Sequence, residues 1–109
     1  MAKHDPSLTL EQMREAALQA TKIAEADDQS IGEVEILALE RCFEIIGEAA
    51  NRLGQEFHDS HPQLPWAQMV GMRNVIIHGY DHVVTETLLV TARKNLRSLV
   101  QQVDELLSK

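Results

Sequence analysis

A chain of 109 residues with only 4 aromatic residues among many Leu, Ile, Val and Ala fits one compact helical domain better than a sheet sandwich. Its 17 acidic and 10 basic residues give a net charge of −7, which argues against electrostatically driven, nonspecific binding of nucleic acid. Cys42 is the single cysteine, so an internal disulfide is excluded, and no apolar run is long enough to span a bilayer. We expect a cytoplasmic protein with a buried thiol and no membrane association.

The first predicted helix follows Asp5 and Pro6, two residues that suit a helix start, and extends to the acidic pair Asp27 and Asp28. Its apolar face is rich in alanine. We therefore expect it to pack closely on a neighbour and to contribute little core volume. Residues 29–32 are predicted to form a short connector.

The second predicted helix covers residues 33–57 and is the central element. Gly47 and Gly54 lie inside it, and each weakens a helix by about 1 kcal/mol relative to Ala. We expect these glycines to permit close backbone approach or to mark a helix end, with fraying at Gly54. The predicted apolar stripe comprises Val34, Leu37, Cys42, Ile45 or Ile46, Ala49, Leu53 and Phe57.

Residues 58–64 are predicted to form a polar connector before a third helix that starts at Pro65 or Trp66. Gly79 is expected to cap the end of that helix in a left-handed conformation. The inner side of the helix is predicted to carry Trp66, Met69 or Val70, Arg73, Ile76 or Ile77, and Tyr80.

The fourth predicted helix starts at Thr85 as its cap and continues to the end of the sequence. Arg93, Lys94 and Arg97 are expected on its polar side. Its apolar seam is predicted to comprise Leu88 or Leu89, Ala92, Leu96, Leu99 or Val100, Val103, and Leu106 or Leu107.

Residues 73–80 bring together side chains that suit chemistry on a phosphate. The Arg73 guanidinium binds phosphate oxygens in a bidentate fork, His78 is suited to proton transfer near neutral pH, and the Tyr80 hydroxyl donates, accepts or is modified. Positions 73 and 78 are about 140° apart on a continuous helix, so one unbroken helix does not present both on one face.

Three arrangements would overcome this separation: a helix end at Gly79, a long Arg73 side chain that wraps round the helix, or a second copy of the chain. Asn74 lies four residues before His78 and shares its face, so Asn74 is predicted to orient the imidazole.

The order Arg73, four residues, His78, one residue, Tyr80 resembles the signature of HEPN domains, specifically of the HepT-like toxins. The resemblance covers residues 34–107 and implies an all-α, antiparallel four- to five-helix bundle that forms a homodimer. A single HEPN/HepT-like domain is expected over residues 1–109. Further agreement comes from residues 38–41, residues 45–49, Pro62, Pro65, Trp66 and residues 71–74.

The resemblance implies the toxin of a prokaryotic type VII toxin–antitoxin system. Such a toxin is a metal-independent endoribonuclease without a cofactor, and its composite Arg-His site lies at the dimer interface. An MntA-like nucleotidyltransferase antitoxin neutralises it by transferring AMP to the motif tyrosine, here Tyr80. The alternative is a catalytically weak or inactive HEPN subunit that binds a nucleotidyltransferase partner, because HEPN domains include noncatalytic modules.

The expected chemistry assigns a role to each motif side chain. His78 would accept the proton of an RNA 2′-hydroxyl or donate one to the leaving 5′-oxygen, and Arg73 would stabilise charge on the phosphate. The 2′-hydroxyl as internal nucleophile makes RNA the substrate, excludes DNA and predicts a 2′,3′-cyclic phosphate product.

Structural roles remain open for the same residues. Arg73 is also suited to a surface ion pair, His78 to a helix-end cap, and Tyr80 to packing on Trp66. Glu48 is predicted either to face the cleft and support Arg73 or to be an exposed helix carboxylate.

Two further histidines, His58 and His61, flank Asp59 in the predicted connector. The sequence near them offers no clear third and fourth ligand, so a metal site is disfavoured.

Overall fold

The computed structural model describes residues 5–78 and 81–109, and their side chains except at positions 75, 77, 78 and 81–84. These residues form helices and contain no strand, which confirms the predicted all-α class. The elements in chain order are α1 (Pro6–Ala24), the short 3-10 helix η1 (Asp28–Ser30), α2 (Glu33–Ser60), α3 (Trp66–His78) and α4 (Asp81–Leu107).

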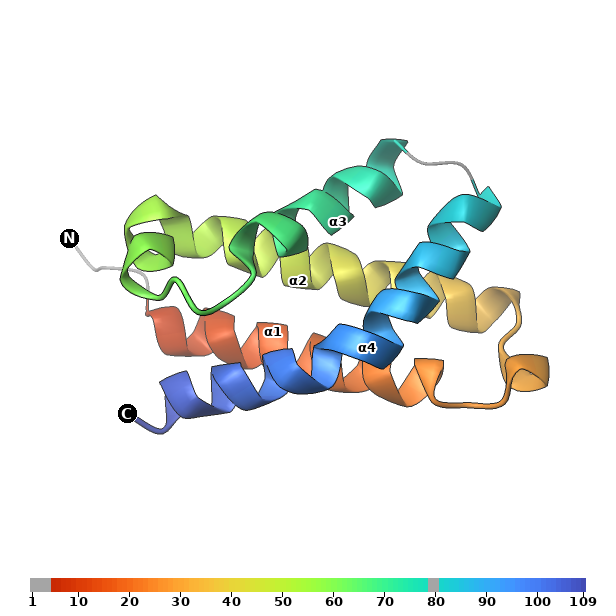
Figure 1. Cartoon of the computed structure of the whole chain (residues 1–109), viewed down its shortest axis with the longest axis horizontal. Helices are drawn as coiled ribbons and strands as arrows, with labels where there is room; N and C mark the ends of the chain where they lie inside the picture. The colour runs from red at the N-terminus through yellow and green to blue at the C-terminus, as the bar shows by residue number, and fades with distance from the viewer. Residues whose placement is uncertain (1–4, 79–80) are drawn as a thin grey trace.

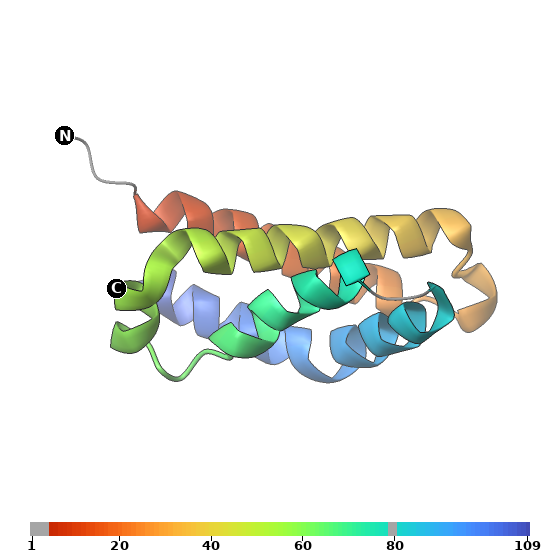
Figure 2. The ribbon, with the colours of Figure 1, turned by 90° about the horizontal axis from the view of Figure 1, so that it is seen from above.

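The helices form a bundle in which α2 contacts each of the other three α-helices (Figure 1). Helices α1 and α2 lie side by side along the long axis of the molecule, and α4 packs on α1 (Figure 2). Helix α3 crosses obliquely and packs mainly against α2. Only two residues separate the end of α3 at His78 from the start of α4 at Asp81, so these two helix ends lie near one another (Figure 1).

Helix α1 begins as the sequence predicts. The Asp5 side chain accepts a hydrogen bond of 2.9 Å from the backbone N–H of Ser7, and Pro6 occupies the first turn. The helix ends at Ala24, earlier than the predicted end at Asp27 and Asp28, and residues 28–30 form η1 instead. Buried alanines let α1 pack between two neighbours; these are Ala16, Ala17, Ala20 and Ala24.

The predicted apolar stripe of α2 is wrong in its first two turns. Val34 is 73% exposed and Leu37 is 61% exposed. At 100° per residue both lie on the side of the helix opposite Leu39 and Ile46, which are buried. The residues of α2 that do enter the core are Leu39, Cys42, Phe43, Ile46, Ala49 and Ala50.

Gly47 has the close-approach role expected of it, whereas at Gly54 the expected fraying is replaced by a kink within a continuing helix. Gly47 is buried where α3 crosses α2, and Gly54 has a φ of 85° that interrupts the helical backbone. Beyond this kink the helix continues to Ser60, so the predicted connector at residues 58–60 is helical.

The last turn of α2 is held by aromatic rings. The His58 ring stacks on Trp66 with centroids 4.4 Å apart, and Phe57 stacks on His61 at 4.2 Å. The Trp66 indole N–H donates a 2.8 Å hydrogen bond to the carbonyl oxygen of His61. These contacts explain why residues 58–60 stay ordered as helix.

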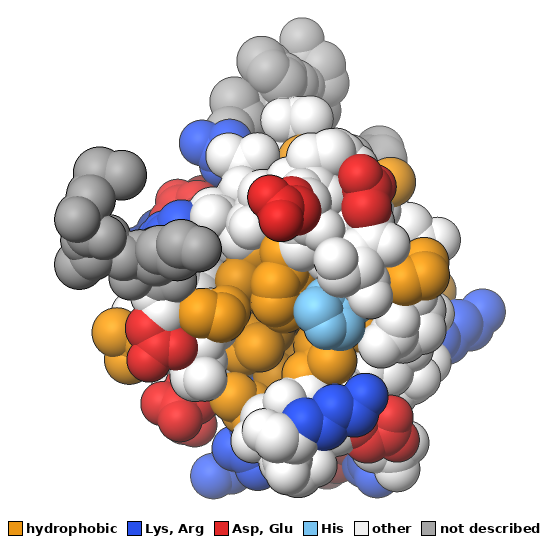
Figure 3. All heavy atoms as spheres, turned by 90° about the vertical axis from the view of Figure 1, so that its left-hand side faces the viewer, with side chains coloured by type: hydrophobic (Ala, Val, Ile, Leu, Met, Phe, Trp, Pro, Cys, Tyr) orange, Lys and Arg blue, Asp and Glu red, His pale blue; other side chains and the backbone are white. Residues whose placement is uncertain are grey.

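The end of the bundle where α1 begins and α4 ends also exposes an apolar patch beside a histidine (Figure 3).

Helix α4 begins at Asp81, four residues before the predicted cap Thr85. No glycine or proline lies between these positions, and aspartate is favoured at helix starts, so the helix extends back to Asp81. The predicted seam is confirmed at its centre by the buried residues Leu88, Ala92, Leu96, Leu99 and Val103. Within the described ranges no helix combines the length and apolarity that a bilayer crossing requires.

Candidate active site

Arg73 lies where α3 packs most closely against α2. A methyl group placed on Gly47 would be 2.7 Å from the Arg73 Cβ and 3.0 Å from the Met69 carbonyl oxygen, so only glycine fits at this crossing. The Arg73 side chain is half-buried. Its guanidinium has no hydrogen bond or ion pair in the part of the chain that the structure describes. A positioned cation without a counter-ion is suited to an anionic ligand.

The positions of the motif are divided between two sides of α3. The helix is continuous through His78, so positions 73 and 78 are about 140° apart. Asn74 is exposed and lies four residues before His78, on the same side of the helix. The His78 side chain, the expected cap at Gly79 and the whole of Tyr80 lie outside the described residues.

The outer side of α3 begins with two small residues, Ala67 and Gly71. Ala67, Gly71, Asn74 and position 78 follow one another at four- and three-residue steps, and we call this line the outer stripe of α3. A methyl group added to Gly71 would meet no atom within 4 Å. Nothing in the described part of the monomer therefore requires glycine at this position.

Glu48 follows Gly47 on α2, but its carboxylate is paired with another arginine. One oxygen of Glu48 lies 3.7 Å from the Arg41 guanidinium, which also contacts Glu44 at 3.2 Å. Among the described residues no ion pair joins Glu48 to Arg73. That Glu48 supports Arg73 stays a prediction.

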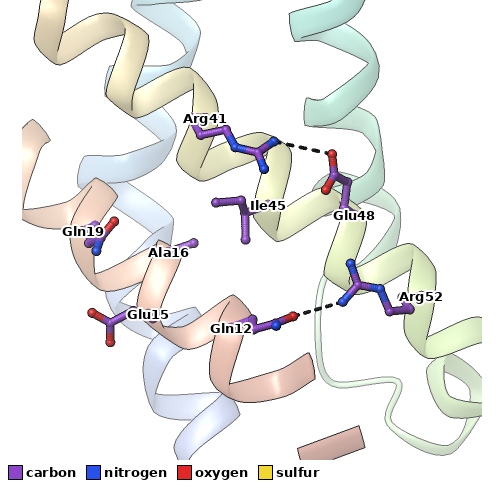
Figure 4. A pocket seen from close by; sticks show the side chains of 8 residues that line it. All are labelled: Gln12, Glu15, Ala16, Gln19, Arg41, Ile45, Glu48 and Arg52. Carbon is purple, nitrogen blue, oxygen red and sulfur yellow. Dashed lines mark hydrogen bonds and ion pairs between the residues drawn. The ribbon is translucent and has the colours of Figure 1, made fainter. Parts of the chain in front are cut away.

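Arg41 and Glu48 belong to an open groove between α1 and α2, with a volume of about 430 Å³ (Figure 4). Arg52 also lines it and donates a 3.0 Å hydrogen bond to the Gln12 side chain. Ile45 and Ala16 lie between these polar pairs. We call this the α1–α2 groove.

A second groove follows the seam between α2 and α3 and has a volume of about 570 Å³. Sequence reasoning missed it, because its walls come from two helices. The only sequence signal was a pair of amide side chains four residues apart, Asn51 and Gln55. We call it the α2–α3 groove, and the side chains that line it include Asn51, Gln55, His58, Asp59, Trp66 and Val70.

The two histidines near the end of α2 bond to the backbone. His58 Nε2 lies 2.6 Å from the Ala50 carbonyl oxygen, and His61 Nδ1 lies 3.0 Å from that of Phe57. A ring nitrogen facing a carbonyl oxygen donates its proton, so it is not a metal ligand in this arrangement. Among the side chains that the structure describes, no group of three His, Cys, Asp or Glu residues is placed to hold a metal ion.

The chain also matches a known protein family. The family model described as "Ribonuclease HepT-like" matches residues 9–106. A protein from Caldanaerobacter subterraneus, provisionally named as an RNase, is 40% identical over 72 residues, which are 66% of this chain and 64% of that protein. One from Thermococcus cleftensis, provisionally named ribonuclease HepT, is 36% identical over 69 residues, 63% of each chain.

A third relative, from Methanocaldococcus jannaschii and also provisionally named as an RNase, is 34% identical over 83 residues. These cover 73% of this chain and 76% of that relative. The matched part of the chain thus spans just under two thirds of the first two relatives and about three quarters of the third. No solved structure matches the chain significantly.

Proposed function

The chain belongs to the HepT-like ribonuclease family, and from this membership we propose that it is the RNA-cleaving toxin of a toxin–antitoxin pair. The observation that carries the proposal is Arg73, a half-buried cation without a counter-ion in the described residues, five positions before His78 on one helix. That pairing supplies a phosphate ligand and a proton-transfer group.

The active form is a homodimer. Arg73 lies toward the α2 seam while Asn74 and position 78 lie on the outer stripe, so one copy holds the two motif residues on different sides of α3. Eight of the 13 residues of α3 are apolar, yet α3 packs mainly against α2. A second α3 laid along the outer stripe packs on the small residues Ala67 and Gly71 and brings the two motifs together.

RNA cleavage in this dimer needs no metal. A His78 imidazole takes the proton of the 2′-hydroxyl as its oxygen bonds to phosphorus, and the bond from phosphorus to the 5′-oxygen breaks. The leaving oxygen takes a proton from water, so the products are a 2′,3′-cyclic phosphate and a 5′-hydroxyl. Arg73 stabilises the charge that grows on the phosphate oxygens.

Cleavage of RNA by purified chain in excess chelator tests this assignment. The chain must first be verified by mass to carry no adduct. We expect cleavage by the parent, and a rate lower by about 10²- to 10⁴-fold for His78→Ala, because a single proton-transfer group contributes that much. Absence of cleavage by the parent on diverse RNAs would instead favour a HEPN subunit that only binds a nucleotidyltransferase.

Tyr80 is the proposed control point. An MntA-like nucleotidyltransferase would transfer AMP from ATP to the phenol oxygen and release pyrophosphate. The added phosphate and bulk would lie two residues from His78 and oppose RNA entry by repulsion and by steric block.

Mass spectrometry of chain coexpressed with such an antitoxin tests the acceptor. The parent is expected to gain the mass of one AMP group, and Tyr80→Phe is expected to gain none. An undiminished AMP adduct on Tyr80→Phe would move the acceptor to another residue.

A further inference from the structure

The α2–α3 groove starts one helical turn from Arg73. Asn51 lies four residues after Gly47, which contacts Arg73, and Val70 lies three residues before Arg73 on α3. One helical turn rises 5.4 Å, so the groove leads away from Arg73 along the seam. A ligand whose phosphate is held by Arg73 would have its next group at the mouth of this groove.

The lining of the groove suits a flat group with one apolar surface and one hydrogen-bonding edge. Trp66 and Val70 supply apolar surface, while Asn51, Gln55 and Asp59 supply polar groups. Among the described side chains only His58 lines the groove as a basic group, so the described lining does not attract the phosphate backbone. Its volume of about 570 Å³ lies within the range of small-ligand pockets.

The polar side of the groove is rich in acceptors. The Gln55 amide donates a 2.8 Å hydrogen bond to Asp59, which leaves the Gln55 carbonyl oxygen and the second Asp59 oxygen as acceptors. Among the described residues the exposed Asn51 amide has no hydrogen bond of its own. Such an edge pairs best with a group that presents an amino donor.

The inner end of the groove is preorganised. His58 is fixed between the Trp66 ring, 4.4 Å away with planes 10° apart, and the Ala50 carbonyl oxygen at 2.6 Å. Trp66 is itself only 8% exposed. A ligand therefore meets a wall that is already ordered, which lowers the entropy cost of binding.

We propose that the α2–α3 groove binds an unpaired RNA base adjacent to the phosphate held by Arg73, and that Asn51 and Gln55 select a base carrying an amino group. The proposal rests on the ribonuclease function. Single-stranded RNA is read through unstacked bases that present their edges to such side chains, and amides and carboxylates accept from amino groups. The groove gives specificity, whereas Arg73 gives the electrostatic contact.

Binding of short labelled oligo(C) and oligo(U) tests the proposal, because these rings have the same size and differ on one edge: cytosine presents an amino group and an unprotonated N3, whereas uracil presents a carbonyl oxygen and an N3–H. The His78→Ala background prevents cleavage during the measurement. We expect oligo(C) to bind about tenfold more tightly than oligo(U). Combined Asn51→Ala and Gln55→Ala substitutions should weaken oligo(C) binding about tenfold and leave oligo(U) binding nearly unchanged.

Gln12→Ala is the matched control, since Gln12 is an exposed amide on the α1–α2 groove (Figure 4). It should leave both affinities unchanged. Asn51 and Gln55 are also exposed, so their removal should preserve the helical circular dichroism. The proposal is overturned by equal binding of the two RNAs, by a preference for oligo(U), or by a preference that survives the double substitution.

Two further results separate this proposal from the assignment as a ribonuclease. If the parent cleaves RNA with a base preference that the double substitution leaves unchanged, only the base-binding role of the α2–α3 groove is rejected. If the parent does not cleave RNA, the ribonuclease function is rejected. A change in oligomeric mass on the double substitution would assign the groove to a protein interface and would also overturn the proposal.

Discussion

Helices α1, α2 and α4 form a part of the molecule that is stabilised from several sides, whereas α3 depends largely on one neighbour. Helix α1 packs against both α2 and α4, and polar contacts add to the apolar core. Arg93 Nε donates a 2.9 Å hydrogen bond to the Ala24 carbonyl oxygen, and Arg97 pairs with Glu25. Helix α3 packs mainly on α2, around Gly47.

The motif occurs in the less supported of these two regions. Small residues on the outer stripe of α3 and the absence of close contacts at Gly71 leave that surface accessible. The difference indicates that α1, α2 and α4 provide the scaffold, and it supports the proposal that a second copy of the chain packs on α3.

Gly71→Gln should disrupt the proposed dimer while the monomer folds normally. The new side chain meets open space in the described monomer, but it would stand between two copies of α3 that approach along the outer stripe. We expect a monomeric mass by light scattering, loss of most RNA cleavage, and an unchanged circular dichroism spectrum. A variant that stays dimeric and active would exclude this face from the interface.

Gly47→Ala should loosen α3 from the scaffold. The methyl group would meet the Arg73 Cβ and the Met69 carbonyl oxygen, and backbone atoms yield only if α3 shifts. Overpacking costs typically about 1–3 kcal/mol. We expect a net loss of unfolding free energy in urea titrations together with weaker RNA cleavage. Unchanged stability and activity would contradict the close crossing.

Arg93→Ala should weaken the scaffold by a smaller amount. The substitution removes the hydrogen bond to Ala24 and a 2.8 Å contact with Asp28, and it removes a cation from the C-terminal end of α1. Because these contacts are partly exposed, we expect a loss of about 1 kcal/mol in urea titrations. The exposed neighbour Lys94 is the control, and Lys94→Ala should change stability by less than about 0.5 kcal/mol.

The smallest expected effect on stability is that of Cys42→Ala on its pH dependence, and this effect is absent at neutral pH. Burial raises the pKa of its thiol above the ordinary value, so the folded protein keeps this proton to a higher pH than the unfolded chain does. The related stability is present at lower pH and is lost as the pH rises from about 8.5 toward the folded pKa. Stability of the parent should therefore fall more steeply with alkaline pH than that of Cys42→Ala; equal slopes would argue against the raised pKa.

The sequence predicted the elements whose signals are local. The Asp5 and Pro6 start of α1, the start of α3 at Trp66 and the seam around Leu88 to Val103 follow from caps and helical periodicity. Prediction from the sequence was wrong where contacts between distant segments determine the structure. Residues 58–60 are helical because the His58 ring stacks on Trp66. The predicted apolar stripe of α2 was wrong at Val34 and Leu37, which are exposed.

The candidate site was predictable in chemistry but not in placement. The spacing of Arg73 and His78 identified the motif residues, and the helical angle between them already required an additional element. That Gly47 would meet Arg73 and that Asn51 would line a groove depend on how α2 crosses α3, whereas the pair of Glu48 with Arg41 lies within α2 itself. Helical periodicity alone does not determine such a crossing.

RNA cleavage by a mixed dimer tests the central claim most directly. One subunit would carry Arg73→Ala and the other His78→Ala, with different tags so that only mixed dimers are purified. Because one composite site would then keep both intact residues, we predict cleavage well above either substituted homodimer and up to about half that of the parent. A mixed dimer that forms stably but cleaves no faster than the substituted homodimers, while the parent is active, would contradict a site shared between two copies of α3.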